Sequence, residues 1–246
     1  MIFCETWLNA SHANSYITVP GYSRPIRCDR KFKRGGGVCL YHKDTVCCKV
    51  LTAGSPTPPW IESIWIHFPM HKLVLLALYV PPSLPASQLN AVITYIVKSA
   101  DEVLNEADDS NLAIIGDLNN LPTSDLEQSL GVTQVVDFPT RGTAILDKIL
   151  IDQELRENFL SPSICPNFGK SDHHAVLMKP ILEKSDSPKI VKVYDYRKSN
   201  INSFLKCLSS QRWQDLYLAE VSIDEKCDIF YSMVNDALEK IPCTYV

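Results

Sequence analysis

LAIIGDLNN, residues 112–120, runs from four apolar side chains straight into a glycine, an aspartate and an asparagine. A short apolar run bounded by a turn signal is typical of a fully buried strand. Because alternate residues of a strand point to the same face, Asp117 and Asn119 would lie side by side where this strand ends. Sites of layered α/β proteins often lie beyond such strand ends. An ordinary Asp/Asn turn explains the same letters, and the stretch alone favours that simpler interpretation.

The first half of the chain reads mainly as β-strands. Gly, Pro and Asp residues separate apolar or alternating runs at residues 1–8, 35–42, 45–51, 60–68 and 72–80. Runs of this length and spacing predict an antiparallel meander with a buried centre.

A long helix is predicted next, because apolar residues recur on one helical face from Leu89 to Leu104. Further strands are expected within residues 112–116, 134–140, 144–151 and 170–181. Strands mixed with a few long helices indicate an α/β or α+β layered domain.

A change to charged composition around residues 183–198 predicts a boundary between a domain at 1–182 and a linker with a tail at 183–246. The tail carries two helical apolar patterns, one from Ile201 to Leu208 and one from Ile223 to Ile241. A segment this short has a small core, so we expect a helical appendage.

Composition is that of an ordinary globular protein, with 46% hydrophobic residues, 21% charged residues and a net charge of −4. The nine cysteines include no C-x-x-C pair, which argues against both a disulfide framework and a zinc site. A reducing, intracellular compartment is therefore expected. The longest aliphatic run, residues 73–80, is too short to span a bilayer, and residues 1–10 lack the pattern of a signal peptide, so no membrane partner is expected.

Residues 24–34, RPIRCDRKFKR, concentrate six of the 24 basic residues against a single acid, Asp29. Because the chain as a whole is acidic, nucleic-acid binding would have to use a local patch such as this one. A solvated loop is the alternative interpretation, and the sequence leaves both open.

Polar residues that could carry chemistry lie at or beside the apolar runs: Glu5, Tyr79, Asp117, Asn119, Asp147, Asp172 and His173. Each of them taken singly is more often structural. Together they suit phosphodiester cleavage, which needs an oriented water and neutralised phosphoryl charge. Carboxylate and carboxamide oxygens indicate an oxygen-liganded metal ion such as Mg²⁺.

The ordered motifs resemble those of the endonuclease/exonuclease/phosphatase superfamily, which includes deoxyribonuclease I and the apurinic/apyrimidinic endonucleases. These motifs are ETW, GGGVCLY, YVPP, GDLN, PTRG followed by LD, and SDHH, and they cover residues 1 to about 180. Among its branches, the endonuclease domain of non-LTR retrotransposons is the most similar. The resemblance implies a two-sheet deoxyribonuclease I-like sandwich with flanking helices and a Mg²⁺-dependent, DNA-nicking hydrolase, with Mn²⁺ as an alternative metal. In a complete element, a reverse transcriptase would follow the tail, and the nuclease would act in the nucleus.

Site roles follow from the resemblance. It implies that Glu5 and Asp172 bind the metal ion, and that Tyr79 contacts the scissile phosphate. Asp117 would orient and deprotonate the attacking water, while Asn119 would hold the phosphate or Asp117.

The remaining implied roles concern charge and DNA contact. His173, paired with Asp147, would stabilise the phosphoryl charge as an imidazolium. Thr140 and Ser171 match positions that line the DNA-binding surface of the retrotransposon branch. From the basic segment we expect backbone contacts by Arg30, Lys31, Lys33 and Arg34.

One departure from the superfamily pattern affects the expected activity. Its members begin with an earlier strand that supplies an Asn to the metal site, whereas this sequence starts at the strand that bears Glu5. The expectation is thus an N-terminally truncated sandwich that lacks the first strand. Two alternatives stay open: a catalytically inactive nucleic-acid-binding remnant, and a phosphodiesterase of the same superfamily that acts on lipid or inositol phosphates.

Overall fold

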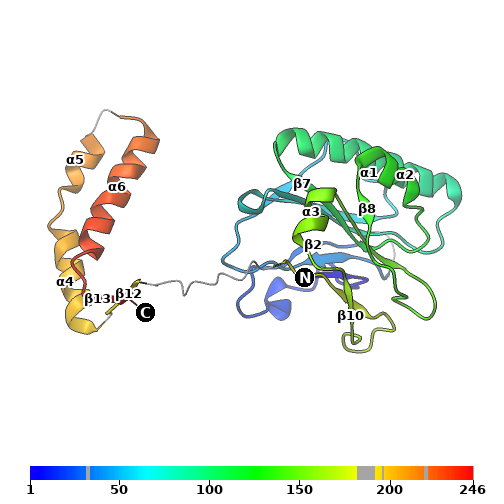
Figure 1. Cartoon of the computed structure of the whole chain (residues 1–246), viewed down its shortest axis with the longest axis horizontal. Helices are drawn as coiled ribbons and strands as arrows, with labels where there is room; N and C mark the ends of the chain where they lie inside the picture. Colours follow the sequence, from blue (N-terminus) through cyan, green and yellow to red (C-terminus); the bar gives the residue numbers. More distant parts are fainter. Residues whose placement is uncertain (32–33, 182–191, 196, 219–220, 246) are drawn as a thin grey trace. The chain divides into compact units, whose positions relative to one another are not determined.

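The structure is a computed structural model that describes residues 1–31, 34–181, 192–195, 197–218 and 221–245. The chain divides into two compact units, Met1–Leu182 and Glu183–Val246. Figure 1 shows the elements of both units.

A six-stranded sheet forms the centre of the first unit. Its strands, in spatial order, are β4 (Lys49–Leu51), β5 (Glu62–Phe68), β6 (Leu73–Tyr79), β7 (Asn111–Asp117), β9 (Asp147–Ile151) and β8 (Thr133–Gln134). All neighbouring strands are antiparallel except β6 and β7. A parallel pair needs a crossover connection, which the 21-residue helix α1 (Ala86–Glu106) provides.

A second, three-stranded antiparallel sheet packs against the first, in the order β1 (Ile2–Cys4), β3 (Val38–Leu40) and β2 (Ile26–Cys28). Val38 and Leu40 pack against Ile64, Ile66 and other residues of β5 and β6. The predicted two-sheet sandwich is therefore confirmed. The predicted single meander is wrong in one respect, because the first half of the chain divides between two sheets that bury their apolar faces against each other.

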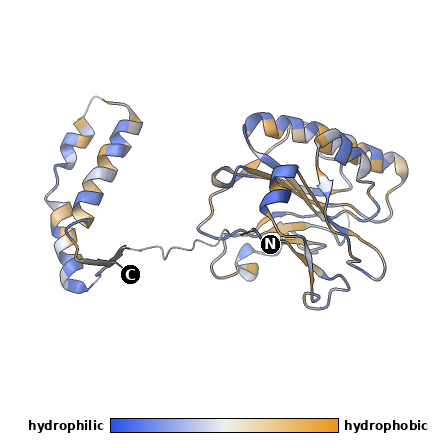
Figure 2. Ribbon diagram, in the orientation of Figure 1, coloured by the Kyte–Doolittle hydropathy of each residue, from blue (hydrophilic) through white to orange (hydrophobic). Residues whose placement is uncertain are grey.

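Helix α1 covers the other face of the six-stranded sheet (Figure 1). Val92, Ile96 and Val103 pack there against the residues of β6 and β7 that face the helix. Figure 2 shows mixed hydrophobic and hydrophilic residues along α1, as expected of a helix with one buried face.

Short elements complete the first unit. They are the 3₁₀ turns η1 (Asn14–Ile17) and η2 (Pro69–His71), the helices α2 (Ser124–Leu130) and α3 (Gln153–Asn158), and the hairpin of β10 (Ser163–Cys165) and β11 (Ala175–Leu177). Val176 and Met178 pack the hairpin end against the core beside Ile149. The hairpin forms a sheet of its own, apart from β1.

Gly116 allows the central strands to approach each other. A Cβ atom at this position would lie well inside van der Waals contact with the Leu78 carbonyl oxygen on β6. The glycine of LAIIGDLNN thus fits the interior of β7, where a larger residue would push the two strands apart.

The described residues of the second unit form three helices, α4 (Lys198–Ser209), α5 (Trp213–Leu218) and α6 (Ile223–Leu238), and the antiparallel pair β12 (Lys192–Tyr194) and β13 (Cys243–Tyr245). The two predicted helical patterns correspond to α4 and α6, whereas α5 was not predicted. Ser222 and Glu225 form a capping box at the start of α6. Of the helices that the structure describes, none has the length and apolar character that a bilayer crossing requires.

Candidate active site

Three of the predicted residues lie side by side at one end of the six-stranded sheet. Tyr79 on β6 pairs with Asp117 on β7, and Asp117 pairs with Asp147 on β9. Residues that are opposite each other in a sheet point to the same face, so the three side chains share one surface. The strand pairing brings together residues that are far apart in the sequence.

His173 joins this group from the loop before β11. Its Nδ1 lies 2.7 Å from Asp147 Oδ2. One ligand atom each of Asp117, Asp147 and His173 all lie within 4.8 Å of one another. The arrangement therefore places two acids and one histidine around a single small volume.

Asp117 is the most deeply buried acid of the group, with 5% of its surface exposed. Burial, and then the neighbouring charge of Asp147, raise the pKa of Asp117 to about 6, while His173 and Asn119 act in the opposite direction. Its Oδ1 is buried and has no hydrogen-bond partner among the described residues. An unsatisfied buried carboxylate oxygen is costly, so this atom is poised to accept a proton, a water or a cation.

Asn119 lies near Asp117, but not for the reason that the sequence suggested. Strand β7 ends at Asp117, and Asn119 has a left-handed backbone with a φ of 47°. Asparagine tolerates this conformation better than most residues. Its Nδ2 donates to the Val80 carbonyl oxygen at 2.9 Å. The expected extended alternation is therefore wrong here, and the turn itself carries Asn119 into the site.

Glu5 reaches the group from the other sheet. The Tyr79 hydroxyl donates to Glu5 Oε1, and Trp7 Nε1 donates to Glu5 Oε2 at 3.4 Å. Burial, and then this hydrogen bond, raise the pKa of Tyr79. Glu5 itself has a positive φ of 52°, in a segment whose Trp7 N–H donates to the Gly36 carbonyl oxygen at 2.9 Å. The glycine turn after β2 thus fixes the backbone that presents Glu5.

Arg30 is engaged in a buried ion pair that the sequence did not reveal. Its Nε and Nη2 donate to the two carboxylate oxygens of Glu62 at 2.7 and 2.9 Å, and Glu62 is only 3% exposed. The guanidinium also lies 5.3 Å from the centre of the Tyr79 ring. An acid inside the alternating apolar run 60–68 was a usable signal, because a buried carboxylate needs a cationic partner.

Some of the other basic residues of segment 24–34 also contact other side chains. Arg27 pairs with Asp29 at 2.9 Å, and Arg34 lies 5.3 Å from the centre of the Trp7 ring. Lys31 forms no ion pair with any residue that the structure describes. Lys33 lies outside the described residues.

Asp172 and Thr140 differ from their expected settings. Asp172 pairs with Arg141 at 2.6 Å and is not part of the Asp117, Asp147 and His173 group. Thr140 is fully buried, and its hydroxyl accepts from the Leu146 N–H at 3.0 Å and from the Asp147 N–H at 3.1 Å. A side chain without exposed surface cannot line a DNA-binding face, so the expectation for Thr140 is corrected: it fixes the start of β9.

Ser171 is exposed, as its expected place on a surface requires. Its Oγ accepts from the His173 N–H at 3.0 Å. Asn167 Nδ2 donates to the Ser171 carbonyl oxygen at 2.8 Å. These contacts shape the loop that presents His173.

A divalent cation fits the donor set of this site. Hard cations prefer carboxylate oxygens, and Asp117 Oδ1 is a buried oxygen without a partner in the described part of the chain. Each carboxylate oxygen of Glu5 keeps a lone pair beyond its one hydrogen bond. The site can therefore hold a cation, position a water and stabilise negative charge.

Comparison with known proteins shows the fold. The 3′-5′ exonuclease NExo from Neisseria meningitidis superposes with a TM-score of 0.53 at 12% identity, covering 73% of this chain and 88% of that chain. The AP endonuclease LMAP from Leishmania major superposes with a TM-score of 0.51 at 14% identity, covering 73% of this chain and 78% of that chain. The endonuclease domain of TRAS1, a telomere-specific non-LTR retrotransposon, superposes with a TM-score of 0.45 at 15% identity, covering 68% of this chain and 83% of that chain. Neither a protein-family model nor a curated protein matches the sequence.

The chain has the deoxyribonuclease I-like fold of NExo and LMAP. At such low identities the likeness establishes the architecture and leaves the chemistry to be argued from the site itself.

Proposed function

We propose that the unit Met1–Leu182 is a metal-dependent phosphodiester hydrolase that nicks DNA. The observation that carries this proposal is the grouping of Asp117, Asp147 and His173 within 4.8 Å at the strand ends. Two nuclease structures with the same fold support the reaction class. A buried acid without a partner, next to an acid–imidazole pair, is what in-line attack of water on a phosphodiester requires.

Each side chain has a role in this proposal. Asp117, whose pKa is raised to about 6, accepts a proton from the attacking water and holds that water in line. His173, held by Asp147, stabilises the charge that develops on the phosphoryl oxygens. Tyr79 contacts the scissile phosphate, and Asn119 orients Asp117.

Mg²⁺ or Mn²⁺, held by Glu5, would neutralise phosphoryl charge when bound. Asp172 is proposed as a second acid near the metal, although its carboxylate is paired with Arg141. Exchange of that ion pair for the metal would have to accompany binding.

DNA is the proposed substrate, and an element-encoded nuclease followed by a reverse transcriptase is the proposed context. Both rest on the ordered motifs, with DNA contacts assigned to Lys31, Lys33, Arg34 and Ser171. A nuclear site of action follows from that context.

Nicking of supercoiled plasmid tests the proposal. We expect open circles in Mg²⁺, none in EDTA, and loss of nicking in Asp117→Asn. Asp101→Asn is the matched control, because Asp101 is an exposed acid on α1. Equal nicking by the parent and Asp117→Asn would refute the assigned role of Asp117, and absence of nicking by the parent would refute the activity.

One observation favours a second candidate, a non-catalytic nucleic-acid-binding protein. The ion pair between Asp172 and Arg141 occupies an acid that the metal site would otherwise use. DNA binding without nicking in the same plasmid assay would support this candidate.

A further inference from the structure

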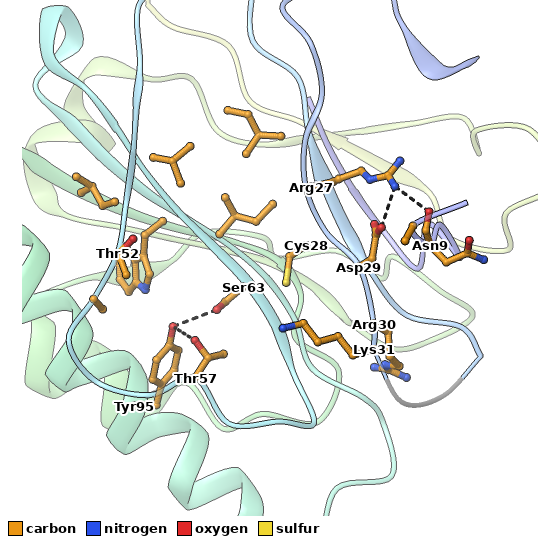
Figure 3. A pocket seen from close by; sticks show the side chains of 17 residues that line it. Asn9, Arg27, Cys28, Asp29, Arg30, Lys31, Thr52, Thr57, Ser63 and Tyr95 are labelled. Atoms are coloured by element: carbon orange, nitrogen blue, oxygen red, sulfur yellow. Dashed lines mark hydrogen bonds and ion pairs between the residues drawn. The ribbon is translucent and has the colours of Figure 1, made fainter. Parts of the chain in front are cut away.

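A cavity of about 740 Å³ lies in the first unit, between β2, the edge strand β4, its neighbour β5, and α1 (Figure 3). Its size falls within the range of small-molecule sites. Arg30 lines the cavity and also lies over the Tyr79 ring, so the cavity adjoins the candidate active site.

A cluster of three hydroxyls on the cavity wall keeps one hydroxyl proton that is not used in a hydrogen bond within the cluster. Thr57 Oγ1 donates to the Tyr95 hydroxyl at 3.1 Å, and Ser63 Oγ lies 3.0 Å from the same oxygen (Figure 3). These two hydrogen bonds use two of the three hydroxyl protons. Whichever of Tyr95 and Ser63 accepts in the shared bond keeps its own proton for another acceptor.

Trp65 supplies a second unused donor. It lines the cavity, only 3% of its surface is exposed, and its Nε1 has no hydrogen-bond partner among the described residues. A buried indole N–H normally finds an acceptor, because leaving it unsatisfied is costly.

Lys31 supplies the third unused hydrogen-bond donor of the cavity. Figure 3 shows its side chain reaching across the cavity toward Ser63 and Tyr95. It has no ion-pair partner in the described ranges of the chain. Among the buried side-chain atoms of the described lining residues, one acceptor has no hydrogen-bond partner, Asp29 Oδ1.

Ile26, Val50, Leu51, Ala53 and Ile64 form an apolar part of the wall, and Asn9, Arg27 and Thr52 also line the cavity. The cavity thus combines the Lys31 ammonium, unused neutral donors and an apolar surface. The complementary ligand is an anion with several hydrogen-bond acceptors and a flat apolar body.

We propose that this cavity binds one nucleoside monophosphate unit, with its phosphate on Lys31 and its base against the apolar wall. Base carbonyl oxygens then accept from Trp65 and from the hydroxyl cluster. The choice of a nucleotide rests on the proposed function, since the cavity adjoins the proposed nuclease site. The unit is either a free mononucleotide or an unstacked nucleotide of a DNA strand.

The test uses thymidine 5′-monophosphate, whose base offers two carbonyl acceptors, and a single-stranded thymidine oligonucleotide. Both are titrated in EDTA into the full chain, and the indole N–H resonance of Trp65 is followed by NMR after assignment with Trp65→Phe. We expect a downfield shift that saturates. Lys31→Ala should weaken binding about tenfold or more, and Tyr95→Phe about three- to tenfold.

Lys98→Ala is the matched control, because Lys98 is exposed on α1 and does not line the cavity. A shift with only one of the two ligands supports nucleotide binding in the cavity. It also shows whether the bound unit is a free mononucleotide or part of a DNA strand. No shift with either, or equal weakening by Lys31→Ala and Lys98→Ala, overturns the proposal. Since the readout needs neither metal nor cleavage, failure to nick DNA would leave a positive binding result intact.

Discussion

The two sheets that build the candidate site are constructed differently. Tyr79, Asp117 and Asp147 stand at the ends of neighbouring strands of the six-stranded sheet, in the registers of β6, β7 and β9. Glu5 follows the three-residue strand β1, which pairs only with β3 in the described part of the chain. Glu5 has a positive φ, and the backbone of the segment after Glu5 is hydrogen-bonded to the glycine turn.

This difference indicates that the site has a rigid half and an adjustable half. Residues fixed by strand register cannot move without disturbing the core, which suits groups that must hold a water in line. Glu5 depends on a few local contacts, which suits a ligand that adapts to a cation.

Replacing the buried acid of the rigid half should have the largest effect on activity. We expect Asp117→Asn to lower the nicking rate on the order of 100- to 10,000-fold at saturating Mg²⁺, because the general base is lost. DNA affinity, measured by fluorescence anisotropy, should stay close to that of the parent. A rate near the parental value would mean that the rigid half does not hold the base.

Two glycine substitutions compare the halves directly in stability. Gly116→Ala places a Cβ against the Leu78 backbone and should lower the free energy of unfolding by roughly 3 kcal/mol or more, as measured by urea denaturation. A Cβ at Gly37, where φ is 93°, would lie 2.5 Å from the Thr6 hydroxyl and at an ordinary contact distance of 3.7 Å from the Cys28 carbonyl oxygen. The cost of Gly37→Ala should be about 1–2 kcal/mol, together with a raised Mg²⁺ requirement. Equal stability losses would remove the proposed difference between the halves.

The raised pKa of Asp117, about 6 against an ordinary value of 3.8, links stability to pH. Between these values the folded chain binds more protons than the unfolded chain, so stability should fall as pH rises. The total change is at most about 3 kcal/mol. Urea titrations in EDTA from pH 4 to 7 should show this slope in the parent and in Asp101→Asn, and a flatter one in Asp117→Asn. An identical slope in all three proteins would contradict the assignment.

Glu5→Gln tests the adjustable half. Exchange of a charged oxygen ligand for a neutral one should raise the Mg²⁺ concentration for half-maximal nicking roughly tenfold, with a smaller effect on the rate at saturation. Glu157→Gln, at an exposed position on α3, is the control. A loss of rate that excess Mg²⁺ fails to restore would place Glu5 in the chemical step instead.

The smallest effect is expected from the basic segment. The double variant Lys31→Ala with Arg34→Ala should reduce the slope of log affinity against log salt by roughly 1 to 2, because each lost phosphate contact lowers the slope by about 0.9. Binding should weaken alike for all DNA sequences. If the slope matches that of Lys98→Ala, the segment is a solvated loop.

Local sequence predicted much of the fold. The apolar face from Leu89 to Leu104 predicted α1, and LAIIGDLNN predicted a buried strand that ends at a polar group. Both signals are local, since helical periodicity and a short apolar run are read within one element. The ordered motifs also indicated the two-sheet sandwich that the structure shows.

Tertiary structure alone decided which side chains meet. Strand register brings Asp117 beside Asp147, and packing pairs Arg30 with Glu62, 32 positions away. The burial of Thr140, the ion pair of Asp172 with Arg141 and the left-handed turn at Asn119 also depend on neighbours outside the local sequence. A sequence pattern specifies which face of an element is apolar, whereas charge pairing and burial depend on which elements that face finds in three dimensions.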